Sequence, residues 1–496
     1  QVSHLDGPRD LPSTKFTSLS VTSPTVAAAT SGGSTTPLWS PTAWWQAIRL
    51  RQAQNQLATP ALVAALIFYV LALFAARRAL ISLAPLVLLA AALLNHRRAA
   101  HWRAYWRNPA ALVPAALYGI LLLSGFITDD VAEWRHQLFR QLLLLAVPLA
   151  IALAPPLGSR HLGRLVGWWL GAGAAVAAAT LAYFYRHRAV LEESISRSKN
   201  LDAITGVGHI YFSVMLALAV LYGAELALTA RLPSRTRQLA AVAALICGLT
   251  LHVLAYRTGL VALYGALGVS VLRLLIVQRR IVLGLAMLLA VAGAPLAAYS
   301  LLPSVQRRVW QTNDDLNRFL NGQDINEYSL SQRLAAWATA GALVREHWGV
   351  GVGQADVRRA MDAQYTTHSF GLRPENRILP HNQYLQYLLG GGIGTLALLL
   401  TLLVLPVVAG PTRGDPFVRH FVVASGCALF FDSMLEVQYG LNPFILNYAV
   451  LAVGPWQARM LAVGESGRPA PPARPYFPPL AAARQPTDNL NDPTAV

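Results

Sequence analysis

The sequence predicts an all-α polytopic membrane protein with about 12 transmembrane helices. Of its 496 residues, 55% are hydrophobic and only 13% are charged, which is too apolar for an ordinary soluble protein. Apolar stretches long enough to cross a bilayer recur along most of the chain. One long polar segment separates the ninth stretch from the tenth, and we expect it to form a large helical loop.

Each predicted helix corresponds to a run of about 20 mostly apolar residues, the length that crosses a bilayer. The runs are residues 57–75, 79–94, 109–127, 141–157, 165–184, 209–229, 238–256, 258–276, 281–301, 384–408, 418–435 and 442–458. They divide the chain into a mostly disordered cytoplasmic segment (1–56), helices one to nine (57–301), the large loop (302–383), helices ten to twelve (384–458) and a disordered cytoplasmic tail (459–496). The chain shows no basic-then-apolar signal peptide at its start, so we expect the first helix to insert directly.

Basic residues set the predicted orientation. The connectors 95–108, 158–164, 231–238, 271–280 and 409–420 fall on one side and together carry 14 basic residues, against 9 in the short connectors on the other. The positive-inside rule makes their side cytoplasmic, so the loop 302–383 lies outside. A net charge of +17 would suggest a nucleic-acid partner in a soluble chain, but here membrane topology explains it, and we expect no nucleic acid.

Cysteine and histidine usage predicts neither disulfides nor a metal site. The two cysteines, Cys247 and Cys427, both lie within apolar runs, and no Cys/His spacing typical of metal ligands is present. The candidate chemistry therefore rests on other polar residues near the outer membrane surface.

Arg257 is the first of these residues, because it is the one formal charge in residues 239–272. That stretch is too long for one helix and leaves almost no loop between two, so the chain must turn sharply at 256–259. An arginine at this depth either marks a helix end by snorkelling or faces a polar cavity.

The large loop brings further cations to the same side. The segment 331–353 has apolar residues at helical spacing and ends at glycines, which predicts an amphipathic helix. The arginines of the loop are Arg307, Arg308, Arg318, Arg333, Arg345, Arg358, Arg359, Arg373 and Arg377. They either pair with acidic residues of the loop or bind an anionic ligand, since guanidinium groups suit phosphate oxygens. His381 ends the loop in "PHNQY", where it either opens a helix or acts chemically.

These motifs together resemble the O-antigen ligases and O-antigen polymerases of bacterial envelopes. The resemblance covers about residues 57–458, and its carriers occur in a fixed order. They are "YRTG" (256–259), "SQRLAAW" (331–337), "GVGVGQAD" (349–356) and "PHNQYLQYLLGGGIG" (380–394). Tyr256 and the extended loop 185–208, with Arg186, Arg188, Arg197 and Lys199, depart from the family pattern, so the acceptor stays open.

The resemblance implies a multi-pass protein of the bacterial inner membrane with its active site facing the periplasm. Such an enzyme moves a glycan from undecaprenyl pyrophosphate to an acceptor without a nucleotide sugar, metal or other cofactor. A ligase uses lipid A-core, which we favour, whereas a polymerase uses another lipid-linked repeat. A lipid-linked oligosaccharide transporter is a weaker alternative, because we see no internal repeat and the polar residues gather at one surface.

Matching the motifs residue by residue implies that Arg257, Arg333 and His381 are catalytic. The two arginines would stabilise the pyrophosphate leaving group, and His381 would take the proton of the acceptor hydroxyl in a displacement that inverts the anomeric carbon. Further substrate-binding candidates are Asn382, Tyr384, Arg373, Arg377 and His209. For the glycines 390–392, we favour helix packing over a groove for the lipid tail.

Overall fold

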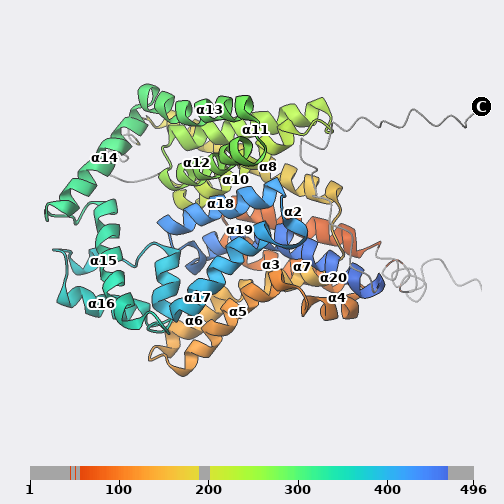
Figure 1. Ribbon diagram of the computed structural model, residues 1–496, viewed down its shortest axis with the longest axis horizontal. Coiled ribbons are helices and arrows are strands. Elements are labelled where there is room, and N and C mark those ends of the chain that lie inside the picture. The colour runs from red at the N-terminus through yellow and green to blue at the C-terminus, as the bar shows by residue number, and fades with distance from the viewer. Residues whose placement is uncertain (1–44, 46–50, 52–55, 189–190, 192–200, 467–496) are drawn as a thin grey trace, which may run out of the picture. The chain divides into compact units, whose positions relative to one another are not determined.

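The computed structural model describes residues 45, 51, 56–188, 191 and 201–466 of the chain (Figure 1). All regular secondary structure in these ranges is helical. The predictions for most of the segment 1–56 and for the end of the tail, together with Arg197 and Lys199, lie outside the described residues.

The helices bear out most of the predicted apolar runs. Their bounds are α2 Ala58–Ala75, α3 Arg78–Leu93, α4 Arg98–Tyr105, α5 Pro109–Leu123, α6 Val131–Gln141, α7 Leu143–Leu153, α8 Ser159–Arg186, α10 His209–Leu228, α11 Ser234–Val253, α12 Arg257–Leu272, α13 Ile281–Leu301, α14 Pro303–Leu320, α15 Ser329–His347, α16 Val357–Thr367, α17 Gln383–Val408, α18 Pro416–Phe431, α19 Gln438–Tyr448 and α20 Gly454–Ser466.

Among the described residues, nine helices are long and apolar enough to cross a membrane, counting α6 with α7 as one. The number rises to 10 if α3 and α4, which meet at a bend of 117°, form one broken span. The all-helical, polytopic class is thus confirmed, whereas the number 12 stays a prediction. Two of the predicted spans are shorter or interrupted: α18 falls below the length of the others, and a π-helical turn at Ala449–Val453 separates α19 from α20.

Several helix ends differ from the predicted bounds for identifiable reasons. Helix α6 starts well before the predicted residue 141, because the Asp130 side chain caps it by accepting a hydrogen bond from the Glu133 N–H. Helix α18 ends at Phe431 instead of continuing to 435, because the next residue, Asp432, adopts an extended backbone. Helix α20 runs past the predicted end at 458 to Ser466.

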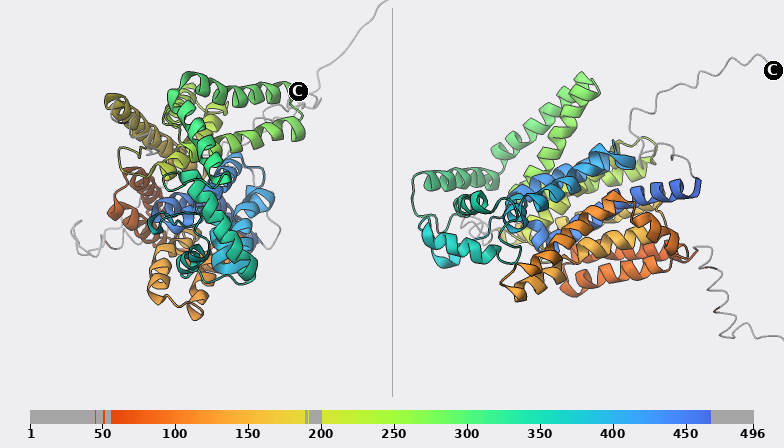
Figure 2. Two further views of the ribbon diagram at one scale, coloured as in Figure 1. Left: turned by 90° about the vertical axis from the view of Figure 1, so that its left-hand side faces the viewer. Right: turned by 60° about the horizontal axis from the view of Figure 1, so that its bottom comes forward.

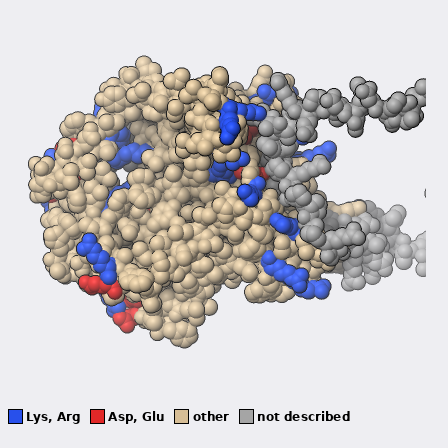
Figure 3. All heavy atoms as spheres, in the orientation of Figure 1, with Lys and Arg blue, Asp and Glu red and all other residues tan. Residues whose placement is uncertain are grey.

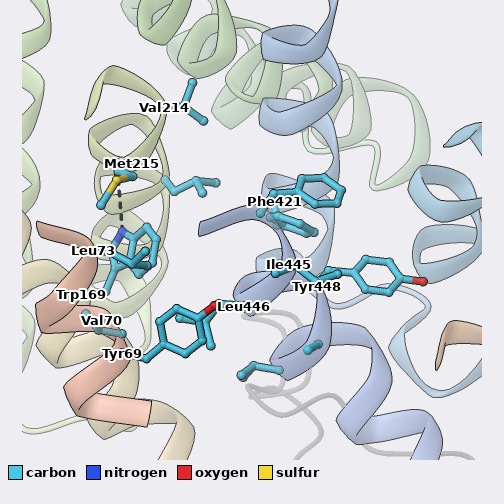
Figure 4. Close-up of a cluster of buried hydrophobic side chains, with 14 of the residues drawn as sticks. Tyr69, Val70, Leu73, Trp169, Val214, Met215, Phe421, Ile445, Leu446 and Tyr448 are labelled. Atoms are coloured by element: carbon cyan, nitrogen blue, oxygen red, sulfur yellow. Dashed lines mark hydrogen bonds between the residues drawn. The ribbon is translucent and has the colours of Figure 1, made fainter. Parts of the chain in front are cut away.

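The transmembrane helices share one continuous apolar core (Figure 4). Aromatic residues from α2, α8, α18 and α19 fill it, and the indole N–H of Trp169 donates a hydrogen bond of 3.2 Å to the carbonyl of Met215. Helix α10 lies in the middle of this arrangement, since it packs against α8, α11, α12 and α18. Because α10 is held by four neighbouring helices, its first residues have a fixed position at that end of the transmembrane helices.

The segment 302–383 is folded and helical; it carries three helices, whereas the sequence predicts one amphipathic helix at 331–353. Helices α14, α15 and α16 lie together at one end of the transmembrane helices (Figure 1). A second apolar cluster, separate from the main core, joins α15 and α16 and includes Leu389 of α17. Helix α13, which leads directly into α14, stands away from its neighbours (Figure 2), and only its residues Gly284 and Ala298 are buried.

Helix α17 is broken at the glycines that the sequence shows as "GGGIG". Gly391 and Gly392 have non-helical backbone angles, and the loop after α15 fills the break. Val352 N–H donates to the Leu389 carbonyl at 2.8 Å, and Ile393 N–H donates to the Trp348 carbonyl at 2.9 Å. The glycines therefore serve packing, as we favoured, and they fasten the folded segment 302–383 to a transmembrane helix.

Replacing Gly392 by alanine should lower the stability of the protein. Gly392 has φ +67°, and a Cβ atom there would overlap with the backbone carbonyl of Gly349. With ψ −165°, this backbone conformation is essentially restricted to glycine and costs another residue about 1–3 kcal/mol, and the overlap adds to that cost. The apparent melting temperature of purified Gly392→Ala should therefore fall clearly. Gly394→Ala is the matched control, since a Cβ there meets no atom within 4 Å; equal melting temperatures for both variants would contradict this account of the break.

Candidate active site

A cavity of about 670 Å³ lies where α14 and α15 cover the ends of α10 and α12. In Figure 3 the surface is hollowed between α14 and α15, and Lys or Arg side chains border the hollow. Three arginines line the cavity: Arg257, Arg308 and Arg333. They belong to α12, α14 and α15, so three helices far apart in sequence each bring one cation to the same space.

Arg257 reaches the cavity because the turn before it is as short as the sequence predicts. Ala255 takes a left-handed backbone conformation with φ +47°, and Tyr256 N–H donates back to the Leu251 carbonyl at 3.1 Å, which closes the end of α11. Arg257 is then the first residue of α12. A cation at a helix N-terminus opposes the helix dipole, so helix stability does not explain its placement. Its guanidinium donates a hydrogen bond of 3.2 Å to Thr312 Oγ1 of α14.

Arg333 lies in the second turn of α15 and connects the cavity with α18. Its guanidinium donates a hydrogen bond of 2.9 Å to the carbonyl of Phe431, the last residue of α18. Burial lowers the pKa of Arg333, while the Asp432 carboxylate nearby acts in the opposite direction. The helix begins at Ser329, which also lines the cavity, so the N-terminus of α15 adds to the positive potential there.

Arg308 is a functional candidate that sequence reasoning did not single out from the nine arginines of the loop. Its side chain is buried, and its guanidinium donates to Gln311 Oε1 at 2.9 Å. Arg308 and Thr312 line the cavity, and Asp315 follows them at helical spacing on α14. This spacing is the signal in the sequence that could have singled out Arg308. Asp315 joins α14 to α15, because its carboxylate accepts a hydrogen bond of 2.7 Å from Leu330 N–H.

The electrostatics of the cavity favour an anion. Burial, followed by the positive charge of Arg257, lowers the pKa of Arg308 to about 10, so this guanidinium stays protonated at neutral pH. Burial also raises the pKa of Asp315, which opposes its charged form. The guanidinium groups of Arg308, which is buried, and of Arg257 and Arg333, which are partly buried, repel one another. An anion bound among them would relieve that repulsion. The N-termini of α10, α12 and α15 all contribute lining residues, and helix N-termini attract anions.

His381 lies beside this cavity through its contact with Asp432. Its Nδ1 is 2.7 Å from Asp432 Oδ1, and the side chain of Asp432 is only 4% exposed whereas that of His381 is 38% exposed. Since the carboxylate can only accept, the Nδ1 atom carries the proton and the Nε2 atom presents its lone pair. Asp432 follows Phe431, which lines the cavity and accepts the hydrogen bond of Arg333. His381 and Arg333 are thus connected through Phe431 and Asp432, which are adjacent in the chain.

The backbone holds His381 in an unusual conformation. Its φ is +45°, a left-handed value that histidine, asparagine and aspartate adopt more readily than most residues. The Trp337 indole fixes the preceding residue by donating a hydrogen bond of 2.6 Å to the Pro380 carbonyl. Strained backbone of this kind persists where neighbouring structure enforces it, and it is frequent at functional sites.

The remaining sequence candidates have different surroundings. His209 lines the cavity, and its Nδ1 is 3.1 Å from Asp202 Oδ1; this hydrogen bond is the main cause of the lowered pKa of Asp202. Asn382 is buried and caps α17 by accepting from the N–H groups of Tyr384 and Leu385. The Tyr384 hydroxyl donates to the Gly426 carbonyl at 2.9 Å. Both residues fasten the start of α17, and their contact with a substrate stays a prediction.

Arg373 and Arg377 are not brought to the cavity. The Arg373 side chain is exposed, while its backbone N–H donates to Asn326. Arg377 lies against α16, where its carbonyl accepts a hydrogen bond of 3.1 Å from Arg358. Their assignment to substrate binding has no support from the arrangement of the cavity and stays a prediction.

Asp432 is the second residue that the sequence analysis missed. It lies inside the apolar run 418–435, which predicts one unbroken transmembrane helix. An acidic residue in an otherwise apolar run is costly, and "FFDSMLE" contains two such residues. That observation alone would have marked Asp432 as a functional candidate on the same grounds as Arg257.

A comparison with protein families finds a match within the chain. The family model for O-antigen ligase matches residues 241–400. The matched region contains Arg257, Arg308, Arg333 and His381, but not Asp432. No curated protein matches the chain. Over residues 241–400, the chain is therefore similar to the O-antigen ligase family.

Proposed function

We propose that the protein transfers a glycan from undecaprenyl pyrophosphate to lipid A-core at the periplasmic face of the bacterial inner membrane. The observation that carries this proposal is the meeting of Arg257, Arg308 and Arg333 at one cavity beside the His381–Asp432 pair. The family match supports a membrane glycosyltransferase that belongs to the ligase and polymerase group. The donor, the acceptor and the orientation are parts of the proposal.

The arginines would bind the pyrophosphate of the donor. Guanidinium groups form paired, charge-assisted hydrogen bonds with phosphate oxygens. Negative charge grows on the pyrophosphate as the bond between the anomeric carbon and its oxygen breaks. Cations fixed around that oxygen stabilise the transition state more than the bound donor, so Arg257, Arg308 and Arg333 would accelerate the reaction as well as bind.

His381 would activate the acceptor. The acceptor hydroxyl attacks the anomeric carbon of the donor sugar, and its proton passes to His381 Nε2 as the new C–O bond forms. The electron pair of the old C–O bond leaves with undecaprenyl pyrophosphate. Asp432 accepts from Nδ1–H, keeps Nε2 free to act as the base, and stabilises the imidazolium that results.

The test of this function uses purified protein with an undecaprenyl-pyrophosphate glycan and two separate acceptors. We expect the glycan to move to lipid A-core, with release of undecaprenyl pyrophosphate. Transfer only to a second carrier-linked glycan would reassign the protein as a polymerase. Movement of the donor across a vesicle membrane without transfer to either acceptor would favour a transporter and overturn the proposal.

Replacing Arg308 by glutamine should weaken use of the donor. The change keeps a polar side chain but removes one of three charges from the cavity, and hydrogen bonds to charged groups contribute about 1.5–3 kcal/mol. We expect kcat/KM for the lipid-linked donor to fall roughly 10- to 100-fold. Arg307→Gln is the matched control, because Arg307 is the neighbouring residue and its side chain is exposed. Equal kinetics for the two variants would remove Arg308 from the site.

A further inference from the structure

Helix α4 lies at the end of the transmembrane helices opposite α14, α15 and α16 (Figure 1). It turns by 117° from the axis of α3, which is mostly apolar. If α3 crosses the bilayer, such a turn directs α4 along the membrane surface instead of into it. This orientation is typical of an interfacial helix.

Buried polar side chains attach α4 and the residues beside it to the ends of neighbouring helices. His101 Nδ1 donates a hydrogen bond of 2.9 Å to the Ala152 carbonyl at the end of α7, and Gln457 of α20 donates to the His101 carbonyl at 2.8 Å. Asn95 donates to Leu153 at 2.7 Å. Asn108, just after α4, caps α5 and donates to the Val453 carbonyl at 3.1 Å. These hydrogen bonds attach α4 and its flanking residues to α7, to α20 and to the residues just before α20.

The outward face of α4, taken together with residues 106 and 107 directly after the helix, consists of two rows of exposed side chains at a spacing of four residues. One row is Arg98, Trp102 and Trp106, and the next row is Ala99, Arg103 and Arg107. Trp102 and Trp106 are 45% and 57% exposed and pack edge to face, with ring centroids 5.6 Å apart. Tryptophans of this kind concentrate at the level of lipid headgroups, and arginines beside them attract anionic headgroups.

The part of the chain that contains α4 carries positive charges and no negative ones over a long stretch. Residues 56–128 contain no aspartate or glutamate. Of the two helices that pack against α4, α7 contains no acidic residue and α20 contains one, Glu465. In Figure 3, Lys and Arg side chains are visible at this end of the molecule. On α20, Arg459 lies over the ring of Trp456 at 5.9 Å and repeats the combination of arginine with tryptophan.

We infer that the outward face of α4, formed by Trp102, Arg103, Trp106 and Arg107, is a docking surface for the anionic phospholipid headgroups of the membrane. The two indoles would lie at the headgroup level, and the two guanidinium groups would bind phosphate oxygens there. The inference does not depend on the proposed transfer reaction, because α4 lies at the other end of the transmembrane helices from the cavity.

The test measures quenching of tryptophan fluorescence by brominated lipids. The protein is reconstituted into phosphatidylcholine vesicles that contain equal fractions of either brominated phosphatidylglycerol or brominated phosphatidylcholine. The contribution of α4 is the part of the quenching that disappears in the variant Trp102→Phe/Trp106→Phe. This subtraction is needed because the chain has 12 tryptophans.

We expect the brominated anionic lipid to quench α4 more strongly than the zwitterionic one. In Arg103→Gln/Arg107→Gln, the relative binding constant for the anionic lipid should fall about fivefold per arginine, the equivalent of about 1 kcal/mol each. The control is Arg160→Gln/Arg164→Gln, which removes the same charge from exposed positions at the start of α8. It should keep the preference seen in the unchanged protein.

Three results would overturn the inference. The first is equal quenching of α4 by the two lipids. The second is a preference that survives in Arg103→Gln/Arg107→Gln, and the third is a control variant that loses as much preference as that one. All four arginines are exposed, so both variants should fold, and matching size-exclusion profiles and melting temperatures would verify this.

Discussion

His381→Asn should reduce glycan transfer by about 10²- to 10⁴-fold, the range that a positioned general base contributes. Asparagine tolerates a left-handed backbone nearly as readily as histidine, so the variant should keep the conformation that His381 has at φ +45°. The loss should appear in kcat at saturating donor, because the imidazole acts on the acceptor hydroxyl and not on the pyrophosphate. Initial rates over a range of donor concentrations separate the two quantities.

His347→Asn is the control for this variant, because His347 is an exposed histidine of the same folded segment. Asp432→Asn extends the test to the second member of the pair. It preserves the shape of the side chain but removes the charge that stabilises the imidazolium, so it should also lower kcat. A His381→Asn protein that transfers glycan at the rate of the unchanged protein would exclude His381 as the base.

Arg257→Ala and Arg333→Ala should each lower kcat by about 10²- to 10³-fold, as does loss of one group that stabilises developing negative charge. Both guanidinium groups line the cavity, and both side chains are partly buried. Arg257→Lys keeps the charge but loses the paired geometry, so it should recover only part of the activity. Single-turnover rates at saturating donor are the measurement that distinguishes catalysis from binding.

Arg345→Ala provides the matched control, since Arg345 is exposed on the same helix as Arg333. It should behave as the unchanged protein does. If Arg257→Ala or Arg333→Ala raised only KM for the donor and left kcat unchanged, that arginine would bind the donor without stabilising the transition state.

The sequence predicts much of the fold because bilayer thickness dictates the length of apolar runs. It also predicts the turn at Arg257, since a single charge in a long apolar stretch leaves few alternatives. It does not predict the break in α17. The three glycines permit a break, but the hydrogen bonds that create it come from Trp348 and Val352, which belong to a distant loop.

The candidate site can be predicted only in part from the sequence, for a similar reason. Nine arginines of one loop look alike in a linear sequence, and only the folded chain separates Arg308, which lines the cavity, from Arg307, which is exposed beside it. The sequence does not single out Asp432, because the apolar run around it predicts an unbroken helix. The contact between His381 and Asp432 joins residues 51 positions apart and depends on how α17 and α18 pack.

The anomeric configuration of the product tests the central claim most directly. One displacement at the anomeric carbon, with His381 as base and pyrophosphate as leaving group, inverts that centre. Nuclear magnetic resonance of the new linkage, formed by purified protein from a donor of known configuration, should therefore show the opposite configuration. A product that retains the donor configuration would require a covalent intermediate on the protein and would contradict the account.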